Sequence, residues 1–141
     1  MKNLIMQKTL FIIVLLLSVQ LLNANEITWV KSYKEAEELA QKENKRILVL
    51  LTSKSCRWCR KLEHTTLESS SIVERINQKY IAVNLKRCKD DFPTYLKAPI
   101  VPFSYFLSSE GRVIVKTPGY WNEEDYNSFL DDVDRKVKYN R

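Results

Sequence analysis

Two cysteines separated by two residues, Cys56 and Cys59, are the residues of this sequence that point most directly to chemistry. Thiols at this spacing can close a small disulfide ring, and a thiolate can attack the disulfide of another molecule. The third cysteine, Cys88, makes the number odd, and three cysteines are too few for a disulfide scaffold. The pair therefore predicts thiol–disulfide exchange, with a passive disulfide or half of a metal site as alternatives.

The reactivity of this pair depends on the elements that position it. An unbroken aliphatic run over 47–51 predicts a strand buried on both faces, and a short polar loop follows it. Behind the loop, Cys59, Leu62 and Thr66 recur at helical spacing. Cys56 then lies at a helix start, where unpaired N–H groups and the helix dipole favour a thiolate. We expect Cys56 to be the nucleophile and Cys59 to resolve the mixed disulfide.

Four basic residues surround the pair in the sequence: Lys54, Arg57, Arg60 and Lys61. Positive charge near the pair should favour the thiolate and a more oxidising reduction potential. Salt screens exposed charges, so the contribution of these residues to the potential should be small.

A metal site is the main structural alternative for the pair. Zinc requires about four ligands, and the sequence adds only Cys88, His64 and carboxylates, with no second Cys-x-x-Cys. A passive disulfide across so short a loop would stabilise little. We expect His64 to be a surface residue rather than a catalytic one. For Cys88 we expect, in decreasing order, a buried apolar residue, a dimer-forming thiol or a third redox partner.

The rest of the chain predicts alternating strands and helices. Strands are expected at 27–30, 80–85, 103–107 and 113–116, with a hairpin turn joining the last two. Helices are expected after the N-cap Ser32, around 72–76, around 90–97 and from about 126 to 137. The order β-α-β-α-β-α-β-β-α predicts an α/β fold, with a central mixed sheet of four to five strands flanked by helices.

Length and composition indicate one small domain, from residue 25 to residue 141. The net charge of +6 includes Lys2 and Lys8, so 6 − 2 leaves +4 for that domain. Basic residues alternate with acidic ones and form no block with interleaved aromatics, which argues against a nucleic-acid partner. No cofactor is expected, because Trp29, Tyr120 and Trp121 fit core or groove-edge positions better than a cofactor site.

Residues 1–24 have the pattern of a secretory signal peptide. Lys2 and Lys8 precede an apolar run that begins at Leu10, and the small residue Ala24 stands before polar residues. The run is shorter than the ~20 apolar residues of a membrane-spanning helix. A signal peptide is therefore favoured over an uncleaved anchor.

The segment around the cysteines resembles the active site of thioredoxin-like proteins, most closely the exported bacterial members. The resemblance rests on residues 48–51 leading into 56–63, and on 65–67 and 71–73 beyond them. This continuation is similar to the subgroup that includes the carboxy-terminal domain of the membrane thiol:disulfide interchange reductase. Val101-Pro102, residues 103–107, Gly111 and Gly119-Tyr120 resemble the family's cis-proline, hairpin and closing glycine.

The resemblance implies a thioredoxin fold with a redox-active Cys56–Cys59 disulfide. Pro102 would follow a cis peptide bond, and the Val101 backbone would bind an extended client segment. Arg57 and Trp58, between the cysteines, would contact the client, with packing over the helix as the alternative for Trp58. The clients would be cysteine-containing exported proteins of the periplasm, and a membrane protein would be the redox partner.

The sequence departs from the family pattern at two positions. Leu50 stands where family reductases usually have a buried acid, and Val83 stands where its lysine partner is usual. Glu63 could accept the proton of Cys59 instead, although we expect it to be a solvated helix residue. Two other functions stay open: a reductase dedicated to one client, such as in cytochrome c maturation, and a binding or chaperone module with a structural or metal-holding cysteine pair.

Overall fold

The computed structural model describes residues 1, 3–8, 11 and 25–139 of the chain. Most of the segment expected to be a signal peptide, 1–24, lies outside the described residues. Of the helices in the part that is described, none combines the length and the apolar character needed to cross a membrane.

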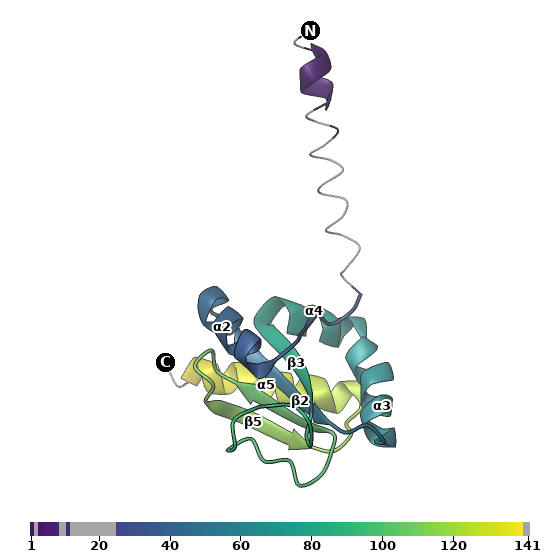
Figure 1. Cartoon of the computed structure of the whole chain (residues 1–141), viewed down its shortest axis with the longest axis vertical. Coiled ribbons are helices and arrows are strands. Elements are labelled where there is room, and N and C mark those ends of the chain that lie inside the picture. Colours follow the sequence, from purple (N-terminus) through teal and green to yellow (C-terminus); the bar gives the residue numbers. More distant parts are fainter. Residues whose placement is uncertain (2, 9–10, 12–24, 140–141) are drawn as a thin grey trace.

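A five-stranded mixed sheet forms the centre of the domain (Figure 1). Its strands are β1 (Trp29–Val30), β2 (Arg46–Thr52), β3 (Tyr80–Lys86), β4 (Phe103–Leu107) and β5 (Val113–Pro118), in the spatial order β1-β3-β2-β4-β5. Strand β3 runs parallel to both β1 and β2, whereas β4 runs antiparallel to both β2 and β5. The mixed sheet expected from the sequence is confirmed.

Helices cover both faces of this sheet. They are α2 (Tyr33–Glu43), α3 (Arg57–His64), the short 3-10 helix η2 (Thr66–Glu68), α4 (Ser70–Lys79) and α5 (Glu123–Tyr139). Residues of α3, α4 and α5 share one apolar cluster on one face, and residues of α2 share a second cluster on the other.

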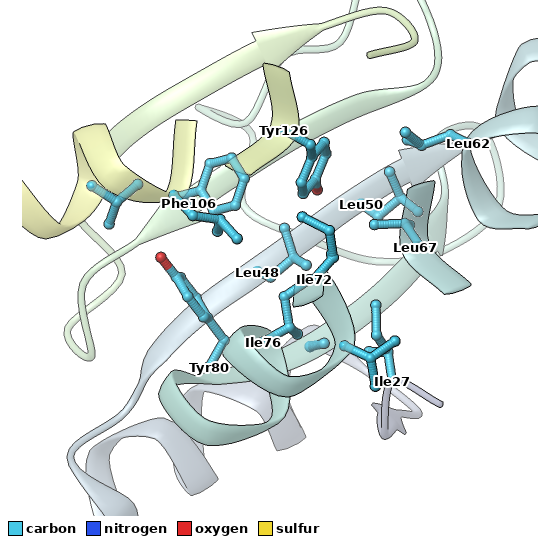
Figure 2. Close-up of a cluster of buried hydrophobic side chains, with 14 residues drawn as sticks. Ile27, Leu48, Leu50, Leu62, Leu67, Ile72, Ile76, Tyr80, Phe106 and Tyr126 are labelled. Carbon is cyan, nitrogen blue, oxygen red and sulfur yellow. The ribbon is translucent and has the colours of Figure 1, made fainter. Parts of the chain in front are cut away.

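Strand β2 contributes to both apolar clusters, which explains its continuous aliphatic run. Leu48 and Leu50 belong to the cluster under α3, α4 and α5, shown in Figure 2, and Val49 belongs to the cluster under α2. Successive side chains of a strand point to opposite faces, so a central strand covered on both sides has no exposed position. Residues 47–52 are accordingly all buried.

The prediction of a helix around 90–97 is wrong, because this segment forms turns. The Asp90 carboxylate accepts a hydrogen bond from the Lys86 N–H at 2.6 Å, and Pro93 has no N–H to donate within a helix. Leu96 is nevertheless buried in the α2 cluster. The observed order is β-α-β-α-α-β-β-β-α, since α3 and α4 both lie between β2 and β3 and no helix lies between β3 and β4.

Candidate active site

Cys56 is the N-cap residue of α3, in the loop that leaves the carboxyl end of β2. Its backbone is extended, and the Cys59 N–H donates a hydrogen bond to Cys56 Sγ at 3.1 Å. The first turn of α3 holds no acidic residue. The sulfur therefore faces unpaired N–H groups and the positive end of the helix dipole, as the sequence predicted.

The two cysteines form a disulfide, with Cα atoms 5.2 Å apart. Their exposure is unequal: Cys56 is half-buried, whereas Cys59 has only 1% of its surface exposed. A large disulfide partner can approach only an exposed sulfur. This difference agrees with Cys56 as the attacking thiol and Cys59 as the resolving one.

A second loop closes over the disulfide from the side of β4. The Val101–Pro102 peptide bond is cis, which confirms the expectation, and the Val101 carbonyl oxygen lies 3.6 Å from Cys56 Sγ. The Arg87 guanidinium donates to the carbonyl oxygens of Ala98 and Pro99 at 2.7 and 3.0 Å. These bonds fix the loop next to the sulfur, so backbone groups at 101 are available beside Cys56.

The aromatic side chain between the cysteines lies at the surface. Trp58 is 50% exposed, and its ring lies 5.6 Å, centroid to centroid, from the ring of Tyr120. The Lys61 Nζ lies 5.0 Å from the Trp58 centroid and 4.6 Å from that of Tyr120, and the Arg57 guanidinium carbon lies 5.9 Å from Trp58. Trp58 therefore both packs against a neighbour and presents half of its surface to solvent next to Cys56.

Leu50 and Val83 are both fully buried, in the two different apolar clusters. Leu50 lies among Leu62, Leu67 and Tyr126 (Figure 2). The position that usually holds a buried acid is thus part of the apolar core, and among the described residues no fully buried side chain is charged.

The nearest polar alternative is a hydrogen-bonded chain at the carboxyl ends of β2 and β3. Asn84, opposite Leu50 in the sheet register, donates to Glu63 Oε1 at 2.5 Å and accepts from the Thr52 hydroxyl at 2.9 Å. The Lys86 ammonium donates to the same hydroxyl at 2.7 Å. Glu63 is half-buried and held against the sheet, so its description as a solvated helix residue is wrong.

Sequence reasoning missed Asn84, although a signal was present. Asn84 is the one polar side chain within the otherwise apolar run from 81 to 85. A polar residue in a strand predicted to be buried requires a hydrogen-bond partner. Which partner it finds depends on α3 packing over β3, and that is a tertiary relationship.

The other two residues considered for chemistry lie apart from the disulfide. Cys88 is exposed, so the first-ranked expectation of a buried residue is wrong; it lies in the turn 87–89 between two charged neighbours, which keeps it at the surface. The His64 side chain is 70% exposed and contacts Glu68, which confirms a surface position. Within the described residues, no group of three or more His, Cys, Asp or Glu side chains is arranged to hold a metal ion.

Comparison with known proteins agrees with this geometry. Residues 16–125 match the family Thioredox_DsbH, described as a protein of unknown function, DUF255. A solved structure titled DsbH oxidoreductase has a TM-score of 0.60 and 21% identity, with 77% of this chain and 84% of that chain covered.

Two further solved structures are similar. A thioredoxin from Thermus thermophilus has a TM-score of 0.66 and 18% identity over 77% of this chain and 87% of its own. A candidate disulphide-isomerase from Bacteroides thetaiotaomicron has a TM-score of 0.68 and 18% identity over 77% and 93%. At identities this low, the structural similarity shows a shared thioredoxin fold and nothing finer. A comparison with curated proteins gives no match.

Proposed function

This chain belongs to the Thioredox_DsbH family, and on that premise we propose that it is an exported thiol:disulfide oxidoreductase acting on cysteines of other exported proteins. The observation that carries the proposal is the unequal exposure of the bonded cysteines at a helix start. Cys56 is accessible beside the Val101–Pro102 loop, and Cys59 is shielded behind it.

The geometry supports a two-step exchange. In the reducing direction, the Cys56 thiolate attacks a client disulfide, a Cys56–client mixed disulfide forms, and one client thiolate leaves. The Cys59 thiolate then attacks Cys56 Sγ, the mixed disulfide breaks, and the second client thiolate is released. Two electrons pass from the protein dithiol to the client, and the same steps in reverse oxidise a client dithiol.

Four features would assist this chemistry. The N-terminus of α3 stabilises the Cys56 thiolate, and the Val101 backbone binds the client segment next to it. Arg57 and Trp58, both exposed next to Cys56 in the sequence, contact the client. Glu63, one helical turn beyond Cys59 and held by Asn84, would receive the Cys59 proton through one water molecule.

Export and the redox partner belong to the proposal. Residues 1–24 have the signal-peptide pattern, and residues 25–141 form the thioredoxin-like domain delivered to the periplasm. A membrane protein then restores the redox state of the pair after each turnover, because exchange with a client leaves it oxidised or reduced. Periplasmic fractionation and the measured N-terminus of the exported protein test this part directly.

Single cysteine variants test the exchange itself. Cys56→Ser should abolish reduction of insulin and refolding of a reduced client, because the attacking thiol is removed. Cys59→Ser should accumulate a disulfide-linked client complex on a non-reducing gel, because resolution is blocked. Cys88→Ser is the matched control and should leave both activities unchanged; activity retained in Cys56→Ser contradicts the proposal.

A titration of the pair against glutathione decides the direction of transfer. A potential near −270 mV is typical of thioredoxin-type reductants, and one near −120 mV is typical of a disulfide donor. The basic residues around Cys56 favour the oxidising side. A disulfide that does not equilibrate with glutathione at all would instead support a structural cysteine pair.

A further inference from the structure

The outward face of α3 is formed by cations around one aromatic ring. Arg57, Trp58, Arg60 and Lys61 are exposed, whereas Cys59 and Leu62 on the inner face are buried. Positions 57, 60 and 61 lie on one side of a helix because they are three and four residues apart. Lys54, in the loop before the helix, is also exposed. This surface, which we call the basic face, borders Cys56.

The basic face has no internal counter-charge. Within the described residues, none of its four cations forms an ion pair, whereas Arg75 of α4 pairs with Asp131 and Asp134 of α5. The only acid of α3 within its first two turns, Glu63, is turned inward to Asn84. The positive charge is therefore directed to solvent.

The cation closest to the aromatic rings is held in place. The Lys61 ammonium lies over both Trp58 and Tyr120, whose rings contact each other. Cation–π contacts orient the ammonium without neutralising its charge. Tryptophan, tyrosine and arginine are also the residue types that dominate binding energy in protein interfaces. The face thus combines a fixed charge with half-exposed aromatic surface.

We propose that the basic face is a docking surface for clients that carry acidic residues next to the reacting cysteine. The inference rests on the proposed exchange activity and names its substrate class. A carboxylate within one or two residues of the client cysteine lies within reach of Arg57, Arg60 or Lys61 once the two sulfurs meet. Basic clients are repelled from the same surface, which gives selectivity as well as attraction.

Exposed charges of this kind act mainly on the rate of encounter. Complementary charge raises association rates, and salt removes the effect because the Debye length falls from ~30 Å at 0.01 M to ~3 Å at 1 M ionic strength. The client charge should therefore change the rate of mixed-disulfide formation, and salt should abolish the difference.

The test uses the purified full chain in its reduced form and three dimeric peptide disulfides. The peptides are identical except that the residues flanking the single cysteine are Glu, Gln or Lys. Each rate of reduction is divided by the rate of the same peptide with dithiothreitol at high salt, where the charge of the dithiothreitol thiolate is screened, so that only differences in the leaving thiol are removed. We expect the corrected Glu-to-Lys rate ratio to be on the order of tenfold at low salt and to approach one at high salt.

Two charge reversals and a matched control locate the effect. Lys61→Glu and Arg60→Glu should each lower the ratio several-fold. Among the described aromatic rings none has a cation–π contact with Arg60, so its reversal leaves the Trp58–Tyr120 pair intact. Lys138→Glu makes the same change in net charge at the end of α5 and should leave the ratio unchanged. Circular dichroism checks that each variant is folded.

The outcomes separate this inference from the proposed function. If no peptide is reduced by the wild-type protein, the exchange activity itself is refuted. If all three are reduced at equal corrected rates, the docking surface is refuted and the exchange activity stands. If Lys138→Glu lowers the corrected Glu-to-Lys rate ratio as much as Lys61→Glu does, the preference for acidic peptides comes from the net charge of the protein, and the docking surface is refuted.

Discussion

At the residue scale, the site departs from the usual pattern at the position six residues before Cys56. Leu50 is fully buried among apolar side chains of α3, η2 and α5. A carboxylate at this point would be desolvated without a cationic partner, because the position of the usual lysine is Val83, which belongs to the other apolar cluster. The protein instead has a series of hydrogen-bonded polar side chains at the carboxyl ends of β2 and β3, which runs from Lys86 through Thr52 and Asn84 to Glu63.

Leu50→Asp tests whether this position still accepts an acid. We expect a loss of about 3 kcal/mol or more in the free energy of unfolding at pH 7, because a charge is buried without compensation. Burial raises the pKa of such a carboxyl, so the folded state binds the proton more tightly and the loss should shrink as pH falls. Urea unfolding from pH 7 to pH 5 measures the change.

Leu50→Asn is the matched control for this prediction. It loses the same apolar contacts and gains a polar group of similar size, but it carries no charge. The difference in unfolding free energy between the Asp and Asn variants should therefore narrow with falling pH. A difference that stays constant over this range would show that position 50 is hydrated in the variant.

At the element scale, the β4–β5 hairpin depends on how its turn packs against α2. Gly111 has a φ of +81°, and a Cβ there would lie 3.1 Å from the Tyr33 hydroxyl and 3.3 Å from that of Tyr95. The Tyr95 hydroxyl also donates to the Gly111 carbonyl oxygen at 2.8 Å. Gly119, after β5, has a φ of +87° and no atom within 4 Å of a Cβ. The two glycines share a backbone conformation but differ in surroundings.

Alanine substitutions at the two glycines should therefore differ in cost. Gly119→Ala should lower the unfolding free energy by about 1–2 kcal/mol, the penalty for an L-residue in the left-handed region. Gly111→Ala should lower it further, since the methyl group also displaces a hydrogen bond worth about 1 kcal/mol. Chemical denaturation of both variants measures the difference, and equal losses would contradict the packing argument.

At the scale of the whole molecule, the reactive end and the opposite end of the sheet are held by different interactions. Cys56 follows the carboxyl end of β2. At the other end of this strand, its first residue, Arg46, donates a hydrogen bond to the Asp134 carboxylate of α5 at 2.6 Å. Lys79 and Arg75 of α4 donate to the same carboxylate at 2.7 and 3.2 Å. The Asp134 side chain thus joins the sheet, α4 and α5 at the end of β2 that is remote from Cys56.

Asp134→Asn should lower the unfolding free energy by about 1–2 kcal/mol at pH 7, since the carboxylate is about a third exposed. Burial alone would raise the pKa of Asp134, but hydrogen bonds from Lys79 and Arg46 outweigh it and lower the pKa from 3.8. Because the pKa is lower in the folded state, the carboxylate stabilises the protein fully at pH values above the pKa of the unfolded state. This stabilisation is lost as the pH falls through the pKa of the folded state.

The stability difference between wild type and Asp134→Asn should therefore be constant from neutral pH to about pH 5 and shrink as pH falls further, through the lowered pKa of the folded state. Thermal unfolding across this range measures it. Asp131→Asn, which removes a more exposed partner of Arg75, is the control and should cost less. Both variants should retain the wild-type rate of thiol–disulfide exchange, because the cluster lies at the far end of the sheet.

Much of the fold and of the reactive pair follows from the sequence alone. Three of the correct predictions rest on local patterns: the aliphatic run 47–51, the helical spacing behind Cys56 and the hairpin over 103–116. Such patterns are informative because the periodicity of apolar residues reflects which side chains are buried. The prediction of a helix at 90–97 was wrong because Leu96 is buried in a cluster with residues from distant strands, without being part of an amphipathic helix. Local pattern carries no information about which distant segment supplies such contacts.

The sequence by itself determined that Cys56 and Cys59 lie at a strand-to-helix junction, because spacing and periodicity encode that junction within a few residues. Only the tertiary structure decided which side chains surround the pair. Helix α3 packing over β3 brings Glu63 to Asn84, and the segment after β5 brings Tyr120 to Trp58 and Lys61. These contacts join residues more than twenty positions apart, so packing of the whole chain is required to form them.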